Sequence, residues 1–151
     1  MSGKKLLPII SSLFIILNLF YSCDSGNSCN DITEINKGII VSPLNISCDV
    51  TTGADQWYIS DNATYLSMFD RTCVLPEIDF KTYSLLGVFT NIDCVSQISR
   101  EVSRDEKLQR YTYRINLSKC SSCKEFEPNL NWVFVPKLPE NWVVHFDVVR
   151  E

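Results

Sequence analysis

The sequence predicts an α+β domain that is mainly antiparallel β, with one short helix followed by about five antiparallel strands and with disulfide braces. Three observations lead to this prediction. Apolar runs with strand-like spacing recur between residues 84 and 149, a single segment has helical spacing, and the chain contains seven cysteines. The 151 residues suffice for one domain, and the 45% hydrophobic and 21% charged residues exclude a disordered tail and a polytopic membrane protein.

Residues 1–22 have the pattern of an export signal. Two lysines precede the apolar segment Leu6–Tyr21, which is shorter than the about 20 residues that a membrane-spanning helix needs. Ser22 and then Cys23 follow this segment, and small polar residues come after the cysteine. This end resembles the signal of bacterial lipoproteins, in which such a cysteine is acylated and becomes the mature N-terminus. Ordinary secretion with cleavage near Ser25 and an uncleaved anchor are the alternatives.

The chain accordingly divides into three parts. We expect a lipoprotein signal peptide over residues 1–22, a lipidated cysteine with a flexible tether over 23–37, and a single globular β-rich domain over 38–151. The expected location is the cell envelope, with the lipid anchor in a membrane and the domain facing the periplasm or the cell exterior. The net charge of −4 is opposite in sign to that of a phosphate-binding surface, so nucleic acid is not an expected partner.

The remaining cysteines are even in number once Cys23 is assigned to the lipid. In an oxidising compartment they can form up to three disulfides, whose connectivity the sequence leaves open. The pair Cys120 and Cys123 could also form a redox centre or half of a zinc site. We favour structural disulfides, because the segment after Cys123 leaves little room for a helix and His145 is the only histidine. The disulfide candidates are Cys29, Cys48, Cys73, Cys94, Cys120 and Cys123.

The first predicted elements are short. Gly38–Val41 and Trp57–Ile59 are apolar enough for strands. Asp61 or Asn62 can cap the segment Ala63–Phe69, whose aromatic and apolar residues recur at helical intervals. These residues predict the one helix of the domain.

Two strong strand signals follow the helix. Ser84–Ile92 is a continuous apolar run typical of a buried strand, and Gly87 within it predicts a bulge or a close-packing point. Cys94–Val102 and Leu108–Leu117 alternate between apolar and polar residues and predict a hairpin. The polar tip of this hairpin belongs to the mixed-charge run Arg100–Lys107, which we expect to be solvated.

The last two predicted strands are Trp132–Val135 and Trp142–Val149. They are joined by Pro136–Asn141, which contains two prolines and therefore predicts a loop. In the second strand His145 alternates with apolar residues, so its side chain is expected to face solvent.

Several of these features together form a recognisable pattern along Trp57–Val149. It resembles a group of Bacteroidetes lipoproteins of unknown function and, more distantly, the C-terminal domain of PrcB-like protease-complex accessory subunits. The resemblance implies an exported, non-catalytic domain and assigns no catalytic residue. The features that carry it are the strand and helix Trp57–Phe69, Cys73, Pro76–Phe80, the strand that starts Ser84-Leu85-Leu86-Gly87, the charged hairpin and the closing segment Asn131–Pro139.

Few residues are candidates for chemistry. A Ser-His-Asp or Cys-His site could be built only around His145, and the common hydrolase, zinc-protease and phosphate-loop motifs are absent from the sequence. Asp79 is the best single polar candidate; an inward-pointing structural cap is favoured over a functional carboxylate. Trp132, Lys137 and Trp142 could form a binding surface, with core packing as the alternative for the two tryptophans.

Together these observations predict a membrane-anchored lipoprotein that acts as a non-catalytic binding or accessory module. We expect no cofactor and no metal, and a partner that is an envelope protein or a glycan. One alternative is a thiol–disulfide redox protein that uses Cys120 and Cys123. Another is a small protease-inhibitor-like domain that presents Pro136–Asn141.

Overall fold

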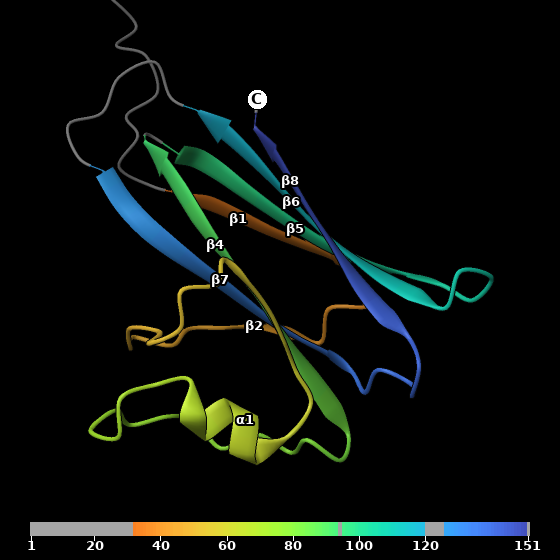
Figure 1. The fold of residues 1–151 in the computed structure, drawn as a ribbon. Coiled ribbons are helices and arrows are strands. Elements are labelled where there is room, and N and C mark those ends of the chain that lie inside the picture. Colours follow the sequence, from red (N-terminus) through yellow and green to blue (C-terminus); the bar gives the residue numbers. More distant parts are fainter. Residues whose placement is uncertain (1–31, 94, 120–125, 151) are drawn as a thin grey trace, which may run out of the picture.

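The structure is a computed structural model that describes residues 32–93, 95–119 and 126–150, in which there are eight strands and one helix. Four strands in the order β1-β5-β6-β8 form the first sheet, and four in the order β2-β7-β4-β3 form the second. The two sheets stack on each other, and the helix lies beside the second sheet (Figure 1). The elements are β1 (Thr33–Gly38), β2 (Ser42–Leu44), β3 (Gln56–Ile59), α1 (Asn62–Ser67), β4 (Tyr83–Asp93), β5 (Val95–Asp105), β6 (Arg110–Lys119), β7 (Phe126–Pro136) and β8 (Val143–Arg150).

The predicted fold class is confirmed in its coarse form, as a mainly β domain with one short helix and a disulfide. The predicted number of strands was wrong, because three strands of the described chain precede α1 in addition to the five that follow it. The pairing was also not wholly antiparallel, since β1 pairs with β5 and β6 pairs with β8 in parallel. Strands β1 and β2 escaped prediction because they are short, mostly exposed edge strands without a clear apolar alternation.

β1 also changes the predicted division of the chain. Residues 33–37 were assigned to the tether, but they hydrogen-bond in register with β5 from Thr33, opposite Gln97, onward. At the end of the strand Gly38 has φ +75° and lies against the backbone of Val102, where a Cβ would overlap the Val102 carbonyl oxygen. The rest of the predicted tether and the predicted signal, residues 1–31, lie outside the described residues.

The helix begins where the sequence predicted it. Asp61 is the N-cap residue, and its carboxylate accepts hydrogen bonds from the backbone N–H and the hydroxyl of Thr64, each at 2.8 Å. α1 is shorter than the predicted Ala63–Phe69, although Tyr65, Met68 and Phe69 are all buried, as the helical spacing indicated.

The main hydrophobic core lies between the sheets. Side chains at alternate positions of β4 and β7 meet those of β5 and β6, and most of them are completely buried. On the β5 and β6 side the core contains Ile98, Val102, Tyr111, Tyr113, Ile115 and Leu117; on the other it contains Leu86, Val88, Val133, Val135 and Leu138.

A second core covers the opposite face of the second sheet. Trp132 of β7 lies at its centre, with its ring 5.4 Å from that of Trp57. Gly87 of β4 is in register with Trp132, and a Cβ at this position would overlap the indole ring. Of the two roles predicted for Gly87, close packing is therefore confirmed, and the β4–β7 ladder continues through it without a bulge.

The predicted hairpin and the last two predicted strands have different outcomes. β5 and β6 form the predicted antiparallel hairpin, which is longer than expected (Figure 1). The final two strands do not pair with each other: β7 lies in the second sheet against β4, whereas β8 crosses to the first sheet. The crossing is made by the predicted loop Pro136–Asn141, in which Leu138 is buried in the main core.

Candidate functional site

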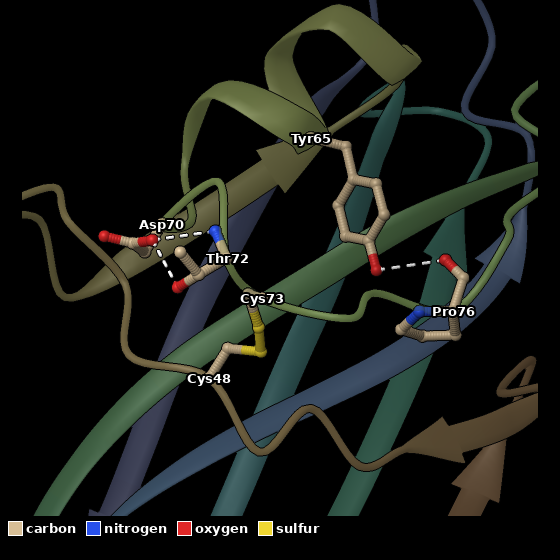
Figure 2. The surroundings of a disulfide bond; sticks show 6 residues. All are labelled: Cys48, Tyr65, Asp70, Thr72, Cys73 and Pro76. Carbon is tan, nitrogen blue, oxygen red and sulfur yellow. Dashed lines mark hydrogen bonds between the residues drawn. A yellow bond between two sulfur atoms is a disulfide. The ribbon is translucent and has the colours of Figure 1, made fainter.

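One of the predicted disulfides joins described residues. Cys48 and Cys73 are bonded, with their Cα atoms 6.2 Å apart, and they connect the segment after β2 to the segment after α1 (Figure 2). In the same region the hydroxyl of Tyr65 donates to the carbonyl oxygen of Pro76 at 3.3 Å. The bond therefore holds together the two segments that cover the second core. The other cysteines of the predicted anchor, disulfide and redox sites lie outside the described residues: Cys23, Cys29, Cys94, Cys120 and Cys123.

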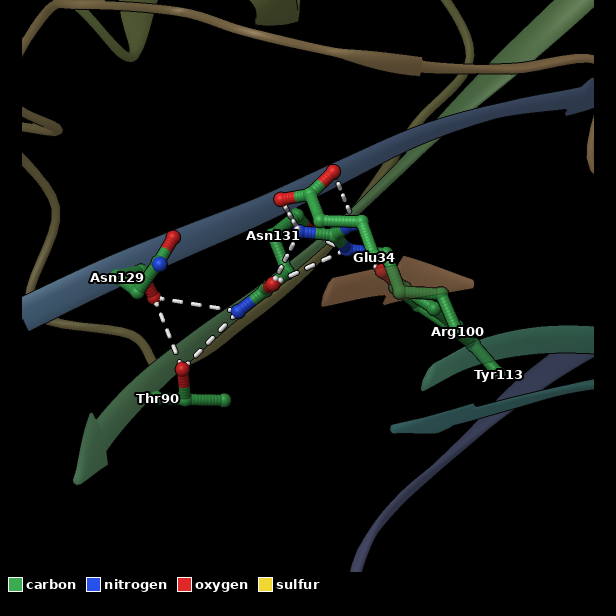
Figure 3. Close-up of polar contacts among 6 residues, drawn as sticks. All are labelled: Glu34, Thr90, Arg100, Tyr113, Asn129 and Asn131. Atoms are coloured by element: carbon green, nitrogen blue, oxygen red, sulfur yellow. Dashed lines mark hydrogen bonds and ion pairs between the residues drawn. The ribbon is translucent and has the colours of Figure 1, made fainter. Parts of the chain in front are cut away.

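A polar group is buried between the sheets, centred on Arg100 of β5 (Figure 3). Its Nε and Nη2 atoms donate to Asn131 Oδ1 at 3.1 and 2.9 Å. Its Nη2 and Nη1 atoms also lie 3.1 and 3.0 Å from the two carboxylate oxygens of Glu34 in β1. The hydrogen bond from Arg100 is the main cause that lowers the pKa of Glu34.

The rest of this group is satisfied by neutral partners. Asn131 Nδ2 donates to Thr90 Oγ1 at 3.0 Å, and the Tyr113 hydroxyl donates to the Asn131 carbonyl oxygen at 3.3 Å. Burial raises the pKa of Tyr113 well above its ordinary value, so this phenol stays neutral. Glu34 is the only carboxylate of the group among the described residues, and the arginine already neutralises it. The group therefore braces the two sheets against each other and offers no acid–base pair.

The sequence did not predict this group. Arg100 was assigned to a solvated charged run, but only 5% of its side chain is exposed. The available signal was its alternation with Ile98 and Val102, which places all three side chains on the face of β5 that enters the core.

The outer face of the first sheet carries a polar cleft of about 280 Å³. Strand β6 runs along its floor, with Thr112 opposite His145 and Arg114 opposite Asp147 on β8. Arg114 Nε lies 2.7 Å from Asp147 Oδ2. We call this site the outer cleft; its lining residues are Glu101, Ser103, Arg110, Thr112, Arg114, His145 and Asp147.

The outer cleft contains a serine, a histidine and an aspartate, but not in the arrangement of a catalytic triad. Asp147 accepts a hydrogen bond from Arg114 rather than orienting His145. Ser103 lies on β5, with β6 between it and β8, so a distance of about 10 Å separates the strands that carry Ser103 and His145. His145 is exposed, as predicted.

One donor in the outer cleft has no partner. Arg110 Nε is buried and makes no hydrogen bond with the described residues. A buried guanidinium N–H without an acceptor is unfavourable.

The predicted binding surface of Trp132, Lys137 and Trp142 requires a correction. Trp132 is 1% exposed in the second core, so it cannot lie on a surface of the folded domain. Trp142 is half-buried in the main core, where it meets Tyr111 edge to face at 5.7 Å and lies 4.9 Å below the guanidinium of Arg104.

Lys137 is exposed, but its ammonium group is engaged. It donates to the carbonyl oxygens of Ser60 and Phe80 at 2.5 and 2.9 Å, which fastens the end of β7 to the segments beside β3 and β4. In the same loop the Leu138 N–H donates to Ser84 Oγ at 3.1 Å. This loop, Pro136–Asn141, is therefore pinned to the domain, an arrangement that does not favour presentation to a protease.

Asp79 caps a turn, as predicted, but it is exposed rather than inward-pointing. Its carboxylate accepts hydrogen bonds from the Lys81 N–H at 3.0 Å and from the Thr82 hydroxyl at 2.7 Å. These bonds, led by the one from Thr82, lower the pKa of Asp79. Both carboxylate oxygens serve the turn that leads into β4, which accounts for this residue without a catalytic role.

Within residues 32–93, 95–119 and 126–150, no cluster of three or more His, Cys, Asp or Glu side chains could hold a metal ion. The same part of the chain contains no helix long and apolar enough to cross a membrane. No family model matches the sequence, and comparisons with curated proteins and with solved structures found no match. The resemblance to Bacteroidetes lipoproteins and PrcB-like subunits therefore stays a prediction.

Proposed function

We propose that this chain is an exported, lipid-anchored protein of the cell envelope whose β domain is a non-catalytic binding module. The anchor rests on the apolar segment Leu6–Tyr21, which is followed by Ser22 and Cys23. The binding role rests on the outer cleft, whose charged side chains are held on three neighbouring strands. Such a face is rigid and open to solvent, which suits recognition of a polar segment of an envelope protein or glycan.

The observation that carries the binding proposal is the unpartnered Nε of Arg110. A guanidinium offers donors in a fixed plane that match a carboxylate, and Arg114 is already committed to Asp147. Arg110 is therefore the residue that would select the ligand. We propose that the ligand presents a carboxylate to this end of the outer cleft.

Nuclear magnetic resonance titration tests the binding role. The full chain in detergent is titrated with glucuronic acid and with an aspartate-containing peptide as probes. We expect amide shifts at Thr112 and His145, and binding weaker by about tenfold or more in Arg110→Gln, which loses the charge. Arg71→Gln, at an exposed position remote in sequence from the cleft strands, is the matched control. Shifts elsewhere, or equal effects of the two substitutions, would contradict the proposal.

Intact mass of the protein from the envelope tests the anchor. A chain that begins at Cys23 and carries acyl chains supports it, and Cys23→Ala should then lose both the added mass and membrane retention. An unmodified chain that begins at Met1 or near Ser25 would refute the lipid anchor without affecting the binding test.

A further inference from the structure

Strand β8 has an open edge. It is the last strand of the first sheet, and among the described residues only β6 pairs with it. The Val143 N–H donates to the Gln109 carbonyl oxygen, on the β6 side. Because backbone direction alternates along a strand, the N–H and C=O groups of Val144, Phe146 and Val148 point to the open side. These groups form a template for another strand.

The other edge strands of the two sheets are protected. β2 has three residues and contains Pro43, and β3 has four residues. β1 contains Lys37 and ends at the positive φ of Gly38. These are devices by which proteins prevent edge pairing. β8 has eight residues and contains neither lysine nor proline.

The apolar side chains of β8 are also incompletely covered. Val144, Phe146 and Val148 pack against the main core but remain half-buried, whereas Tyr113 and Ile115 on the neighbouring strand β6 are fully buried. On the outer face Val143 is 58% exposed. A strand placed beside β8 would bury more of this surface, which would stabilise the pairing.

The sequence of β8 is complementary to itself. Residues 143–149 read Val-Val-His-Phe-Asp-Val-Val. In an antiparallel pair of two such strands centred on Phe146, each valine faces a valine, and His145 of each copy faces Asp147 of the other. Apolar pairs and polar pairs that can hydrogen-bond are favourable when they lie directly across a ladder.

The neighbouring registers are less favourable. Shifting the pair by two residues keeps the open-side backbone groups aligned but places either His145 opposite itself or Asp147 opposite itself. Asp147 opposite itself brings two carboxylates together, which is destabilising, and His145 opposite itself loses both histidine–aspartate pairs. The side-chain pattern of β8 therefore favours the register centred on Phe146.

We infer that β8 is the contact surface between two copies of this chain, which pair antiparallel about a two-fold axis at Phe146. The two first sheets then form one continuous sheet across the contact. An interface of one strand from each copy is small, so the dissociation constant is expected to be about micromolar.

Two double variants with the same valines replaced test this inference. V143K/V149K places lysine opposite lysine at both ends of the pair, whereas V143E/V149K places glutamate opposite lysine. Both positions lie on the outer face of β8, away from the main core. Sedimentation equilibrium of the full chain in density-matched detergent should show a dimer for the wild type and for V143E/V149K. The V143K/V149K variant should dissociate at least about tenfold more readily.

Tyr58→Lys is the control, since Tyr58 is 40% exposed on the edge strand β3 and should leave the dimer unchanged. Far-ultraviolet circular dichroism checks the fold of each variant. If V143K/V149K does not fold, His145→Asp replaces it, because this change puts a second carboxylate opposite Asp147 at both places where the pair had a histidine. A monomeric wild type, or equal dissociation constants for the like-charge and opposite-charge variants, would overturn the inference.

Discussion

Gly87 and Trp132 illustrate how two residues on paired strands share one position in a core. Gly87 lies opposite Trp132 in the β4–β7 ladder, and the indole ring occupies the space that a Cβ would take. The ring also contacts Trp57 and Phe69, so it cannot move without disturbing both. The second core therefore depends on a missing side chain as much as on the large ones.

Gly87→Ala should lower the free energy of unfolding by about 1–3 kcal/mol, because the added methyl group displaces the Trp132 ring in a packed core. Urea unfolding followed by tryptophan fluorescence measures the change. Gly53→Ala is the matched control, since no atom lies within 4 Å of a Cβ at Gly53. Equal effects of the two substitutions would contradict the packing argument.

The ion pair between Arg100 and Glu34 is a second example of two residues that act together. The arginine is buried, whereas 48% of the Glu34 side chain is exposed, so water screens part of the interaction. The hydrogen bonds to Asn131 keep the guanidinium satisfied on its other side. Glu34 is thus the partner whose ionisation makes this brace dependent on pH.

Glu34→Gln should lower stability by about 1 kcal/mol at pH 6. The folded-state pKa of Glu34 lies below its ordinary value of 4.5, so its contribution is present above that value and is lost as the pH falls through the folded-state pKa. The stability difference between wild type and variant should therefore shrink toward pH 3 in urea titrations. Glu106→Gln, in an exposed ion pair, should change stability by less than about 0.5 kcal/mol at pH 6. A constant difference for Glu34→Gln would refute this assignment.

Among the elements, α1 and the segments joined by Cys48–Cys73 form a layer with little regular structure. α1 contains six residues, too few to be stable alone, and it depends on the Asp61 cap and on its contacts with the second sheet. The disulfide closes the chain around this layer. Together they keep water away from Trp57 and Trp132.

Replacing Cys48 and Cys73 by alanine should lower the free energy of unfolding by about 2–4 kcal/mol, because the loop that they close gains freedom in the unfolded chain. Denaturant unfolding of the double variant and the wild type measures this difference. Tryptophan fluorescence of the native variant should still report buried rings, since the strands that carry them remain paired. Unchanged stability would show that the bond does not restrict the unfolded chain.

Elements with local signals could be predicted from the sequence. The alternation in β5 and β6 and the Asp61 cap of α1 depend on neighbouring residues, and both predictions held. β1 and β2 depend on hydrogen bonds to distant strands and carry few buried side chains, so no local pattern marks them. For the outer cleft the sequence predicted that His145 is exposed. It did not predict which residues of β5 and β6 lie beside His145, because these neighbours depend on the register between strands.

At the scale of the whole molecule, the second sheet lies between two cores of different construction. The main core joins two sheets through long strands, and the second core is closed by α1 and loops. The placement of β7 and β8 in separate sheets, which the sequence did not predict, creates this arrangement. It results from packing of Leu138 and its neighbours across the sandwich, an interaction between residues remote in sequence.

Hydrogen exchange should reflect this division. We expect amides in β4, β5, β6 and β7 to exchange slowest, because these strands are paired on both sides, and α1 amides to exchange much faster through local opening. Mass spectrometry of exchanged peptides from the oxidised protein measures the order. Protection of α1 equal to that of β6 would show that the two cores open as one unit.

The parallel pairing of β1 with β5 has a consequence for the time course of folding. Thr33 must meet Gln97, so β1 can pair only once the long intervening segment has closed into a loop, which costs conformational entropy. The β5–β6 hairpin, whose strands adjoin in sequence, can assemble early and present its free side. We therefore expect β1 to dock late, and the molecule to fold on the millisecond-to-second timescale of β proteins rich in distant contacts.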